Sequence, residues 1–279
     1  MPELPEVETV RAGLAPELVG RSIRALAITD FPGVIGTGTI EETSARIVDR
    51  SIADVARRGK FLMIVLDDGD GIVVHLRMTG VLTLDESSAP PPRFLRLSAL
   101  LDDGRELRFA DQRKFGRFVA ASSQELSDLD GRLGPEPFGP NFTPDYLLTR
   151  IRGRRAPVKA LLLDQGIVAG LGNIYVDEAL FLARIHPMTS GGSLTPAQVS
   201  ELHSTIVSVL HSGIARRGVS FSSFRDVYGN SGENQQHLVV YGRGGRGLPC
   251  LVCGETVQRI VIGNRGTSFC PACQPFGQT

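Results

Sequence analysis

The spacing of apolar positions changes along the chain and predicts a leading helix followed by a region rich in strands. Between residues 6 and 18, apolar side chains recur at helical spacing; they are Val7, Val10, Leu14 and Leu18. From residue 22 to residue 121, short apolar runs alternate with turn-forming segments such as Asp67–Gly71 and Asp102–Gly104. These runs predict strands over residues 61–66, 72–76, 95–100 and 115–119. Antiparallel strands at this spacing indicate a β-sandwich.

The second half of the chain has helical periodicity, which follows a linker rich in glycine and proline at residues 134–144. We expect helices over residues 144–152, 157–164 and 173–184, and a longer helix that opens at Thr195 and Pro196. Thr195 and Gln198 have the spacing of a capping box, with Pro196 at the first helical position. Residues 218–236 are polar and contain glycines, so we expect a mobile loop there.

All four cysteines lie near the C-terminus in two pairs, Cys250 with Cys253 and Cys270 with Cys273, and sixteen residues separate the pairs. This spacing is typical of a tetrahedral four-cysteine zinc site. Two disulfides are the alternative, which the reducing cytosol disfavours. Short apolar runs between the pairs predict a hairpin with Arg265 at its tip. Four thiolates leave no open coordination position, so we expect one structural zinc ion per chain.

These patterns together predict an α+β protein with three regions. Residues 1–132 are expected to form an antiparallel β-sandwich preceded by a helix. Residues 133–236 are expected to form a helical domain that includes the polar loop, and residues 237–279 a zinc-binding hairpin.

Composition and charge narrow the class of protein only slightly. The net charge is zero, yet residues 1–132 carry 17 basic against 21 acidic residues, and residues 133–279 carry 13 against 9. An arginine-biased second half is compatible with phosphate contacts. No apolar run approaches the roughly 18 residues of a membrane-spanning helix, and no secretory leader is recognisable. We therefore expect a soluble cytoplasmic protein without a membrane partner.

The N-terminus carries the first candidate for chemistry. Removal of Met1 would make Pro2 the terminal residue, with a secondary amine whose pKa is near 8 in model peptides, well below the roughly 10.4 of lysine. A neutral amine can attack an electrophilic carbon and form an iminium, and Glu3 and Glu6 are close enough in the chain to assist as acid or base. The alternative is that Pro2 and Pro5 only stiffen an extended leader.

The glycine-rich segment Gly166–Asn173 lies between two predicted helices. A dinucleotide-binding fingerprint would follow a strand, so this segment is a poor match to one. Glycine-rich turns beside a helix N-terminus expose backbone N–H groups that bind phosphate. Asn173 is expected at the N-cap, where it either contacts the same phosphate or simply caps its helix.

Over essentially its full length, the chain resembles the formamidopyrimidine-DNA glycosylase family, the bacterial 8-oxoguanine DNA glycosylases. The four cysteines carry part of this resemblance. The other matching segments are 2–8 (PELPEVE), 57–60 (RRGK), 75–80 (HLRMTG), 111–116 (DQRKFG), 133–137 (LGPEP), 170–175 (GLGNIY) and 241–243 (YGR). Together and in this order they form a specific signature.

The resemblance implies a β-sandwich with a leading catalytic helix, then a helix–two-turn–helix domain with a zinc finger, and damaged duplex DNA in the cleft between the lobes. It implies that a monomer removes oxidised purines such as 8-oxoguanine and formamidopyrimidines and then cuts the strand by β,δ-elimination. Pro2 would attack the sugar, Glu3 would move protons, and Glu6 would hold the N-terminus and sugar in place. Four residues match phosphate-contacting positions: Lys60, which also belongs with the catalytic group, Lys159, Asn173 and Arg265.

Met78, Arg113 and Phe115 match the family's three residues that fill the gap left by the everted base. Apolar side chains can wedge a base step apart, and arginine can satisfy the orphaned partner base. Without the resemblance, Met78 and Phe115 would also fit core positions, and Arg113 a solvated strand position. His75 ends an apolar strand, and we interpret it as structural or at most a neighbour of a phosphate.

The chain departs from the commoner family pattern at a few positions. Gln112 stands where proline is frequent, and Arg77 stands where a small residue is frequent. The polar loop matches the base-capping region in position better than in detail, which leaves the lesion preference open. Leu4 favours the purine-lesion branch, because the sister endonuclease VIII group usually carries glycine there.

Three other functions compete with a purine-lesion glycosylase of the bacterial cytoplasm and nucleoid. An endonuclease VIII-like enzyme would remove oxidised pyrimidines instead. A non-catalytic damage-binding protein would not need a terminal secondary amine beside two carboxylates. A zinc-ribbon module in transcription would leave the N-terminal half unexplained.

Overall fold

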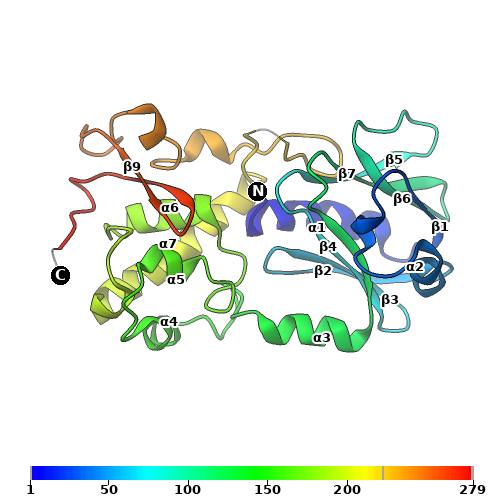
Figure 1. Ribbon diagram of the computed structural model, residues 1–279, viewed down its shortest axis with the longest axis horizontal. Coiled ribbons are helices and arrows are strands. Elements are labelled where there is room, and N and C mark those ends of the chain that lie inside the picture. The colour runs from blue at the N-terminus through cyan, green and yellow to red at the C-terminus, as the bar shows by residue number, and fades with distance from the viewer. Residues whose placement is uncertain (1, 222, 278–279) are drawn as a thin grey trace. The chain divides into compact units, whose positions relative to one another are not determined.

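The strand-rich part of the chain forms two antiparallel sheets of four strands each (Figure 1). One sheet has the order β1 (Ile23–Ile28), β6 (Leu95–Leu101), β7 (Arg105–Asp111) and β5 (Gly80–Glu86). The other has the order β2 (Ile52–Arg58), β3 (Phe61–Leu66), β4 (Gly71–His75) and β8 (Arg117–Ala121). The expected α+β fold with an antiparallel sandwich is confirmed.

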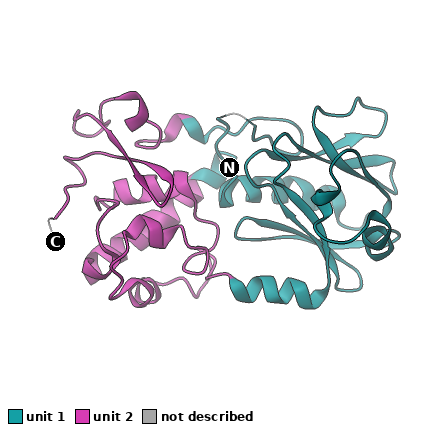
Figure 2. Cartoon of the chain, viewed as in Figure 1, with its two compact units in different colours: residues 1–132, 213–235 teal, residues 133–212, 236–279 magenta. Residues whose placement is uncertain are grey.

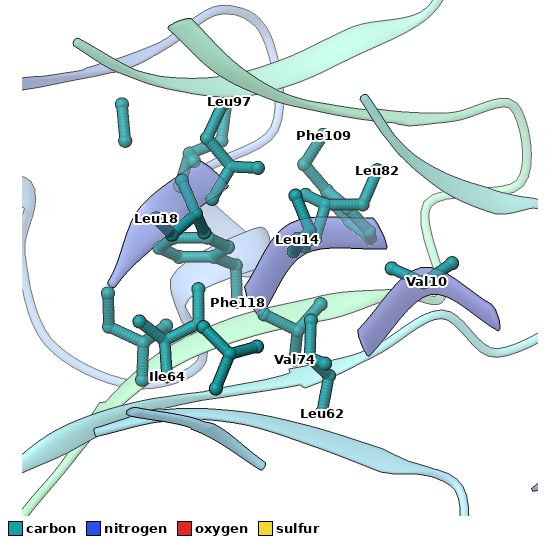
Figure 3. Close-up of a cluster of buried hydrophobic side chains, with 14 of the residues drawn as sticks. Val10, Leu14, Leu18, Leu62, Ile64, Val74, Leu82, Leu97, Phe109 and Phe118 are labelled. Atoms are coloured by element: carbon teal, nitrogen blue, oxygen red, sulfur yellow. The ribbon is translucent and has the colours of Figure 1, made fainter. Parts of the chain in front are cut away.

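Helix α1 (Leu4–Leu18) supplies apolar side chains to the core of the sandwich. In Figure 3, Leu14 and Leu18 lie between side chains of the two sheets, with Phe109 on one side and Ile64 on the other. Leu14, Leu18, Phe109 and Ile64 are all fully buried. Burying a leucine or phenylalanine side chain contributes about 1.5–3 kcal/mol, so this packing fixes α1, and with it the N-terminus, on the sandwich.

The computed structural model describes residues 2–221 and 223–277 and divides the chain into two compact units (Figure 2). Unit 1 joins residues 1–132 with residues 213–235, and unit 2 joins residues 133–212 with residues 236–279. The polar loop that we expected to belong to the helical domain is thus grouped with the sandwich. The physical reason is that Phe224 and Val227 of this loop are buried in the sandwich core.

Unit 2 is helical and ends in the expected hairpin. Its helices are α4 (Pro144–Ile151), α5 (Val158–Leu162), α6 (Asn173–Leu182) and most of α7 (Pro196–Ala215), and its hairpin is β9 (Gln258–Ile262) with β10 (Arg265–Phe269). The capping box at the start of α7 is confirmed. The Thr195 N–H donates to Gln198 Oε1 at 2.9 Å, and the Gln198 N–H donates to Thr195 Oγ1 at 3.3 Å.

Three short elements complete unit 1: a 3-10 turn at Pro32–Ile35 and the helices α2 (Ile40–Ile47) and α3 (Ser123–Arg132). Further 3-10 turns lie at Gly191–Ser193, Asn234–His237 and Gly244–Arg246. Among the described residues, none of the helices combines the length and the apolar character needed to cross a membrane.

Candidate functional site

The N-terminal residues are held by two buried carboxylates at the start of α1. Pro2 is buried, and Glu3 and Glu6 are exposed by only 2% and 1%. The backbone N–H of Glu3 donates to Glu6 Oε2 at 2.7 Å. Because Glu6 lies in the first turn of α1, the helix dipole also favours its negative charge. The candidate nucleophile Pro2 therefore directly precedes Glu3, whose backbone is held by the Glu6 carboxylate.

Glu6 also holds the beginning of the polar loop. Its Oε1 accepts a hydrogen bond from the Val219 N–H at 2.7 Å. Gly218 has φ +75°, and a Cβ there would lie 2.6 Å from Glu6 Oε1. A Cβ at Gly232 would lie 2.3 Å from the Gly218 carbonyl oxygen. Gly218 therefore packs closely against the Glu6 carboxylate, and Gly232 packs against the Gly218 carbonyl. Only glycine leaves enough room at either position.

The polar loop is closed by its own hydrogen bonds. The Asn234 N–H donates to the Gly218 carbonyl at 2.9 Å, and the Ser220 N–H donates to Gln235 Oε1 at 3.1 Å. The Gly232 N–H donates to Ser220 Oγ at 2.9 Å. Gly232–Gln235, which match the base-capping region by sequence, thus form the base of the loop.

Lys60 lies in the turn between β2 and β3 and is only 8% exposed. Arg57 donates to Glu8 Oε2 at 2.9 Å, which ties this end of β2 to α1. The positive charge of Lys60 also reaches His75. Burial, followed by the charges of Arg77 and Lys60, lowers the pKa of His75 to about 3. His75 is therefore neutral at pH 7, and its Nδ1 accepts the Arg77 N–H at 3.0 Å.

Met78, Arg113 and Phe115 come together on the surface of unit 1, and we call these three residues the wedge cluster. Arg113 Nη1 lies 3.0 Å from Met78 Sδ, and its guanidinium carbon is 4.8 Å from the centre of the Phe115 ring. Met78 is 38% exposed and Phe115 48% exposed, so neither residue is part of the core. An exposed apolar cluster with a cation stacked on it suits insertion into a base stack.

A buried aspartate that sequence reasoning missed shapes the loop that carries this cluster. Asp111 is 1% exposed, and its Oδ2 accepts the N–H groups of Phe115 (2.8 Å) and Gly116 (2.7 Å). Its Oδ1 accepts the Arg113 N–H at 3.1 Å and the hydroxyl of Thr79, which neighbours Met78. One carboxylate thus fixes both loops of the wedge cluster. The signal in the sequence that could have pointed to this residue is its place at the head of the segment 111–116, which matches the family pattern.

Lys159 is fully buried, which differs from the direct phosphate contact that the resemblance implies. Its Nζ donates to Asp177 Oδ1 at 2.6 Å, to Thr267 Oγ1 at 2.7 Å and to the Gly266 carbonyl at 3.3 Å. A lysine has three N–H donors, and these contacts take up all three. Lys159 therefore ties helix α5 to α6 and to the zinc hairpin.

Asn173 contacts the hairpin that carries Arg265. Gly172, and not Asn173, is the N-cap of α6, and the Asn173 amide donates to the Gly266 carbonyl at 3.0 Å. Asn173 Oδ1 is buried and has no hydrogen-bond partner. Arg265 is exposed and directly follows a turn in which Gly263 and Asn264 have φ +54° and +60°. Positive φ at both residues is typical of a tight hairpin turn.

The four cysteines form one cluster. All four sulfur atoms lie within 4.8 Å of one another, with 3.9 Å between those of Cys250 and Cys273 and 3.5 Å between those of Cys253 and Cys270. Tetrahedral zinc with Zn–S bonds of about 2.3 Å places its sulfurs about 3.8 Å apart. The donor set therefore suits one structural zinc ion.

A second buried carboxylate holds the segment that leads into the zinc hairpin. Glu178 of α6 accepts the backbone N–H groups of Val239, Val240 and Tyr241 at 2.8, 2.9 and 2.8 Å. Burial raises the pKa of Glu178, and these hydrogen bonds oppose that rise. No pattern in the sequence indicated this contact, because acidic residues on a helix usually face solvent.

Comparison with family models places this architecture among the zinc-finger DNA glycosylases. Residues 1–118 match the formamidopyrimidine-DNA glycosylase N-terminal domain, residues 133–225 match the H2TH domain of the same enzymes, and residues 247–275 match the zinc finger found in FPG and IleRS. The chain is 48% identical over 274 residues to the formamidopyrimidine-DNA glycosylase of Chloroflexus aurantiacus, with 98% of each chain covered. A relative in Symbiobacterium thermophilum is 48% identical over 278 residues, which cover 99% of this chain and 90% of that protein. The chain belongs to the formamidopyrimidine-DNA glycosylase family.

Solved structures agree with this assignment. The Lactococcus lactis Fpg in complex with DNA containing an abasic site has a TM-score of 0.90 and 36% identity, covering 98% of this chain and 99% of that one. A variant of that enzyme bound to DNA containing Fapy-dG has a TM-score of 0.91 at the same identity, covering 98% and 100%. The wild-type enzyme bound to DNA containing an oxidised pyrimidine has a TM-score of 0.89, also at 36% identity and with 98% and 100% covered.

Proposed function

We propose that this protein is a bifunctional DNA glycosylase and AP lyase that excises oxidised purines, including 8-oxoguanine and formamidopyrimidines, from duplex DNA. The observation that carries the proposal is Pro2 at the start of α1 beside the buried carboxylates of Glu3 and Glu6. Such a grouping suits amine nucleophilic catalysis with acid–base assistance. The family assignment and the DNA lesions bound by the Lactococcus lactis relative support the substrate class.

The chemistry begins when the neutral amine of Pro2 attacks C1′ of the damaged nucleotide. The glycosidic bond breaks, and its electron pair leaves with the base, which takes up a proton. Glu3 protonates the ring oxygen, the sugar ring opens, and an iminium joins Pro2 to C1′. Loss of a C2′ proton then breaks the C3′–O bond, a second elimination breaks the C5′–O bond, and water hydrolyses the iminium to free Pro2.

The remaining residues bind and deform the DNA in this proposal. The target base must leave the stack to reach Pro2, and the wedge cluster fills the gap that it leaves. Lys60, Asn173 and Arg265 contact phosphates, which suits donors of this kind. Lys159 acts through Asn173 and Arg265 by holding the zinc hairpin. The four cysteines hold the zinc ion, which stabilises this hairpin.

We propose that the enzyme acts as a monomer on bacterial DNA, and therefore in the cytoplasm at the nucleoid. All of the groups assigned above lie on one chain. We also propose three functional regions: residues 1–132 for catalysis, residues 133–236 for DNA and base-capping contacts, and residues 237–279 for the zinc finger.

Single-turnover cleavage of duplexes tests the proposal. One duplex carries 8-oxoguanine opposite cytosine, and the other carries an oxidised pyrimidine. The proposal predicts faster excision of 8-oxoguanine, with strand cleavage on both sides of the lesion. Glu3→Gln should slow this reaction severely, whereas Glu41→Gln, at an exposed position on α2, should leave it unchanged. Faster excision of the pyrimidine would assign the protein to the sister specificity, and tight binding without cleavage would make it a damage-binding protein.

A further inference from the structure

Residues 218–235, which we call the recognition loop, return to α1 at two separate places. The first is the contact of Val219 with Glu6 described above. The second involves residues 226–230, which we call the second foot, and it lies on α1 near Gly13. Helix α1 therefore contacts the recognition loop near its start, at Val219, and again at residues 226–230.

Gly13 forms a notch that Val227 fills. A Cβ added at Gly13 would lie 2.6 Å from Val227 Cγ2 but 3.7 Å from Val227 Cβ. Carbon atoms in contact are about 3.5–4.0 Å apart, so any side chain at Gly13 would displace Val227 by about 1 Å. Val227 is 1% exposed and β-branched, and it cannot rotate away easily.

The second foot is a rigid turn that would move as a whole. The Asp226 carboxylate accepts the N–H groups of Tyr228 (3.0 Å) and Asn230 (2.7 Å). The Tyr228 hydroxyl donates to Glu17 Oε1 of α1 at 3.1 Å, and the Leu84 N–H of β5 donates to the Val227 carbonyl at 3.2 Å. A shift of Val227 would therefore strain every contact of the foot.

A cavity of about 370 Å³ lies between α1 and the foot. Its lining includes Thr9, Ala12 and Gly13 of α1. On the other side it includes Ile214 at the end of α7 and Arg217, which follows α7. The foot is held by Val227 in the notch, by Tyr228 on Glu17 and by the hydrogen bond from Leu84 to the Val227 carbonyl.

The foot is connected to the part of the loop that faces the wedge cluster. Phe224 is buried two residues before the foot, and its carbonyl accepts the Ser220 hydroxyl at 2.9 Å. The Ser223 hydroxyl lies 3.5 Å from the Met78 carbonyl oxygen. A displaced foot would thus misplace the loop residues beside Met78.

We propose that Gly13 and Val227 are positioning residues for lesion selection. Their close packing sets the height of the recognition loop over the everted base, and neither residue touches DNA. This inference rests on the proposed glycosylase function. Excision of a damaged base requires the loop, whereas cleavage at an abasic site does not, because no base remains to be capped.

The test compares two reactions of Gly13→Ala under single-turnover conditions. Excision of 8-oxoguanine should slow by about tenfold to 100-fold, the range expected for a misplacement of about 1 Å, and cleavage of abasic-site DNA should stay within about twofold. Adding Val227→Ala removes the clashing methyl group while keeping its Cβ at an ordinary contact distance. The double variant should therefore recover the excision rate of Val227→Ala alone.

Gly131→Ala is the matched control, because Gly131 also lies in a helix but a Cβ there meets no atom within 4 Å. It should leave both reactions unchanged. Equal losses in both reactions of Gly13→Ala, no loss in either, or no recovery in the double variant would each overturn the inference. If Gly13→Ala does not fold, the inference requires the double variant to fold. Inactivity of the wild-type protein on both substrates would instead reject the proposed function.

Discussion

Lys159 and Asp177 form an ion pair with 2.6 Å between Nζ and Oδ1, and neither side chain is exposed to solvent. Asp177 also accepts the Ser268 N–H at 2.9 Å, and Lys159 donates to Thr267. The pair therefore joins α5 and α6 to strand β10 of the zinc hairpin. From its place in the interior, we expect the pair to set the position of the hairpin.

Breaking this pair from either side should destabilise unit 2. Lys159→Met leaves a buried carboxylate without its cation, which costs about 3–5 kcal/mol. Asp177→Asn should cost a similar amount, and the double variant should cost less than the sum because no uncompensated charge remains. Unfolding in urea, detected by the release of zinc, measures these differences in the free energy of unfolding.

The DNA affinity of the same variants separates positioning from direct contact. If Lys159 contacted a phosphate, Lys159→Met would reduce the slope of log affinity against log salt by about 1 and leave stability intact. We expect the reverse, with lost stability and a smaller change in slope than Arg265→Ala produces. A stable Lys159→Met protein with a reduced slope would contradict our assignment.

Asp111→Asn should disorder the wedge cluster without removing any of its members. In the wild type, backbone N–H groups donate to the carboxylate. The NH₂ of the asparagine cannot accept these hydrogen bonds, and the loss destabilises the folded protein by about 1–3 kcal/mol. Excision of 8-oxoguanine opposite cytosine should fall relative to excision opposite adenine by about tenfold, as Arg113 loses its fixed position beside the orphaned base. The ratio of single-turnover rates on the two duplexes measures this effect.

Asp85→Asn controls for the loss of a carboxylate in the same sheet. Asp85 on β5 accepts the hydroxyl of Thr83, two residues earlier on the same strand, at 2.7 Å. Its substitution should leave the cytosine-to-adenine ratio unchanged. An unchanged ratio in Asp111→Asn as well would show that the wedge cluster does not depend on this carboxylate.

His75 should make the protein less stable in mild acid. Burial, followed by the charges of Arg77 and Lys60, lowers its pKa to about 3 in the folded state, whereas an unfolded histidine titrates near 6.5. Below about pH 6.5 only the unfolded chain binds the proton, so stability falls as the pH falls. Between about pH 7 and pH 5, His75 should account for a loss of about 2 kcal/mol.

His75→Gln isolates this contribution, since glutamine does not titrate. Free energies of unfolding in urea at both pH values, for wild type and variant, give the difference. The variant should lose about 2 kcal/mol less than the wild type over this range. Parallel losses in the two proteins would mean that His75 is protonated in the folded state.

Zinc removal should affect the hairpin selectively. The purified chain should contain one zinc ion, and a strong chelator should release it and disorder β9 and β10. Affinity for damaged DNA should then fall steeply, because Arg265 and the Gly266 partner of Asn173 lose their positions. Full DNA affinity in the zinc-free protein would contradict this role.

Much of the fold could be predicted because its signals are local. The 3.6-residue period of α7, its capping box and the aspartate–glycine turns of unit 1 each act over a few neighbouring residues. The predicted strands did not include β1, β2, β5 or β7, because charged residues such as Arg24 in β1, Asp54 in β2 and Arg108 in β7 interrupt their apolar pattern. Pairing with neighbouring strands, which a local pattern does not encode, stabilises them.

The parts of the candidate site that a sequence motif indicates could be predicted. The residues whose role depends on tertiary contacts could not. The four cysteines and the wedge cluster come together as their motifs imply. The burial of Lys159 and the four hydrogen bonds of Asp111 arise from segments distant in sequence or from the exact path of a loop. A lysine or aspartate in a sequence carries no sign of which contact it will make.

The most direct test of the central claim is to locate the covalent bond to DNA. Borohydride reduction during cleavage of an 8-oxoguanine duplex traps the iminium, and mass spectrometry of the tryptic peptides identifies the attached residue. We predict a deoxyribose-derived adduct on the N-terminal peptide Pro2–Arg11, at the proline nitrogen. An adduct on a lysine such as Lys60, or no adduct despite strand cleavage, would contradict catalysis by the N-terminal amine.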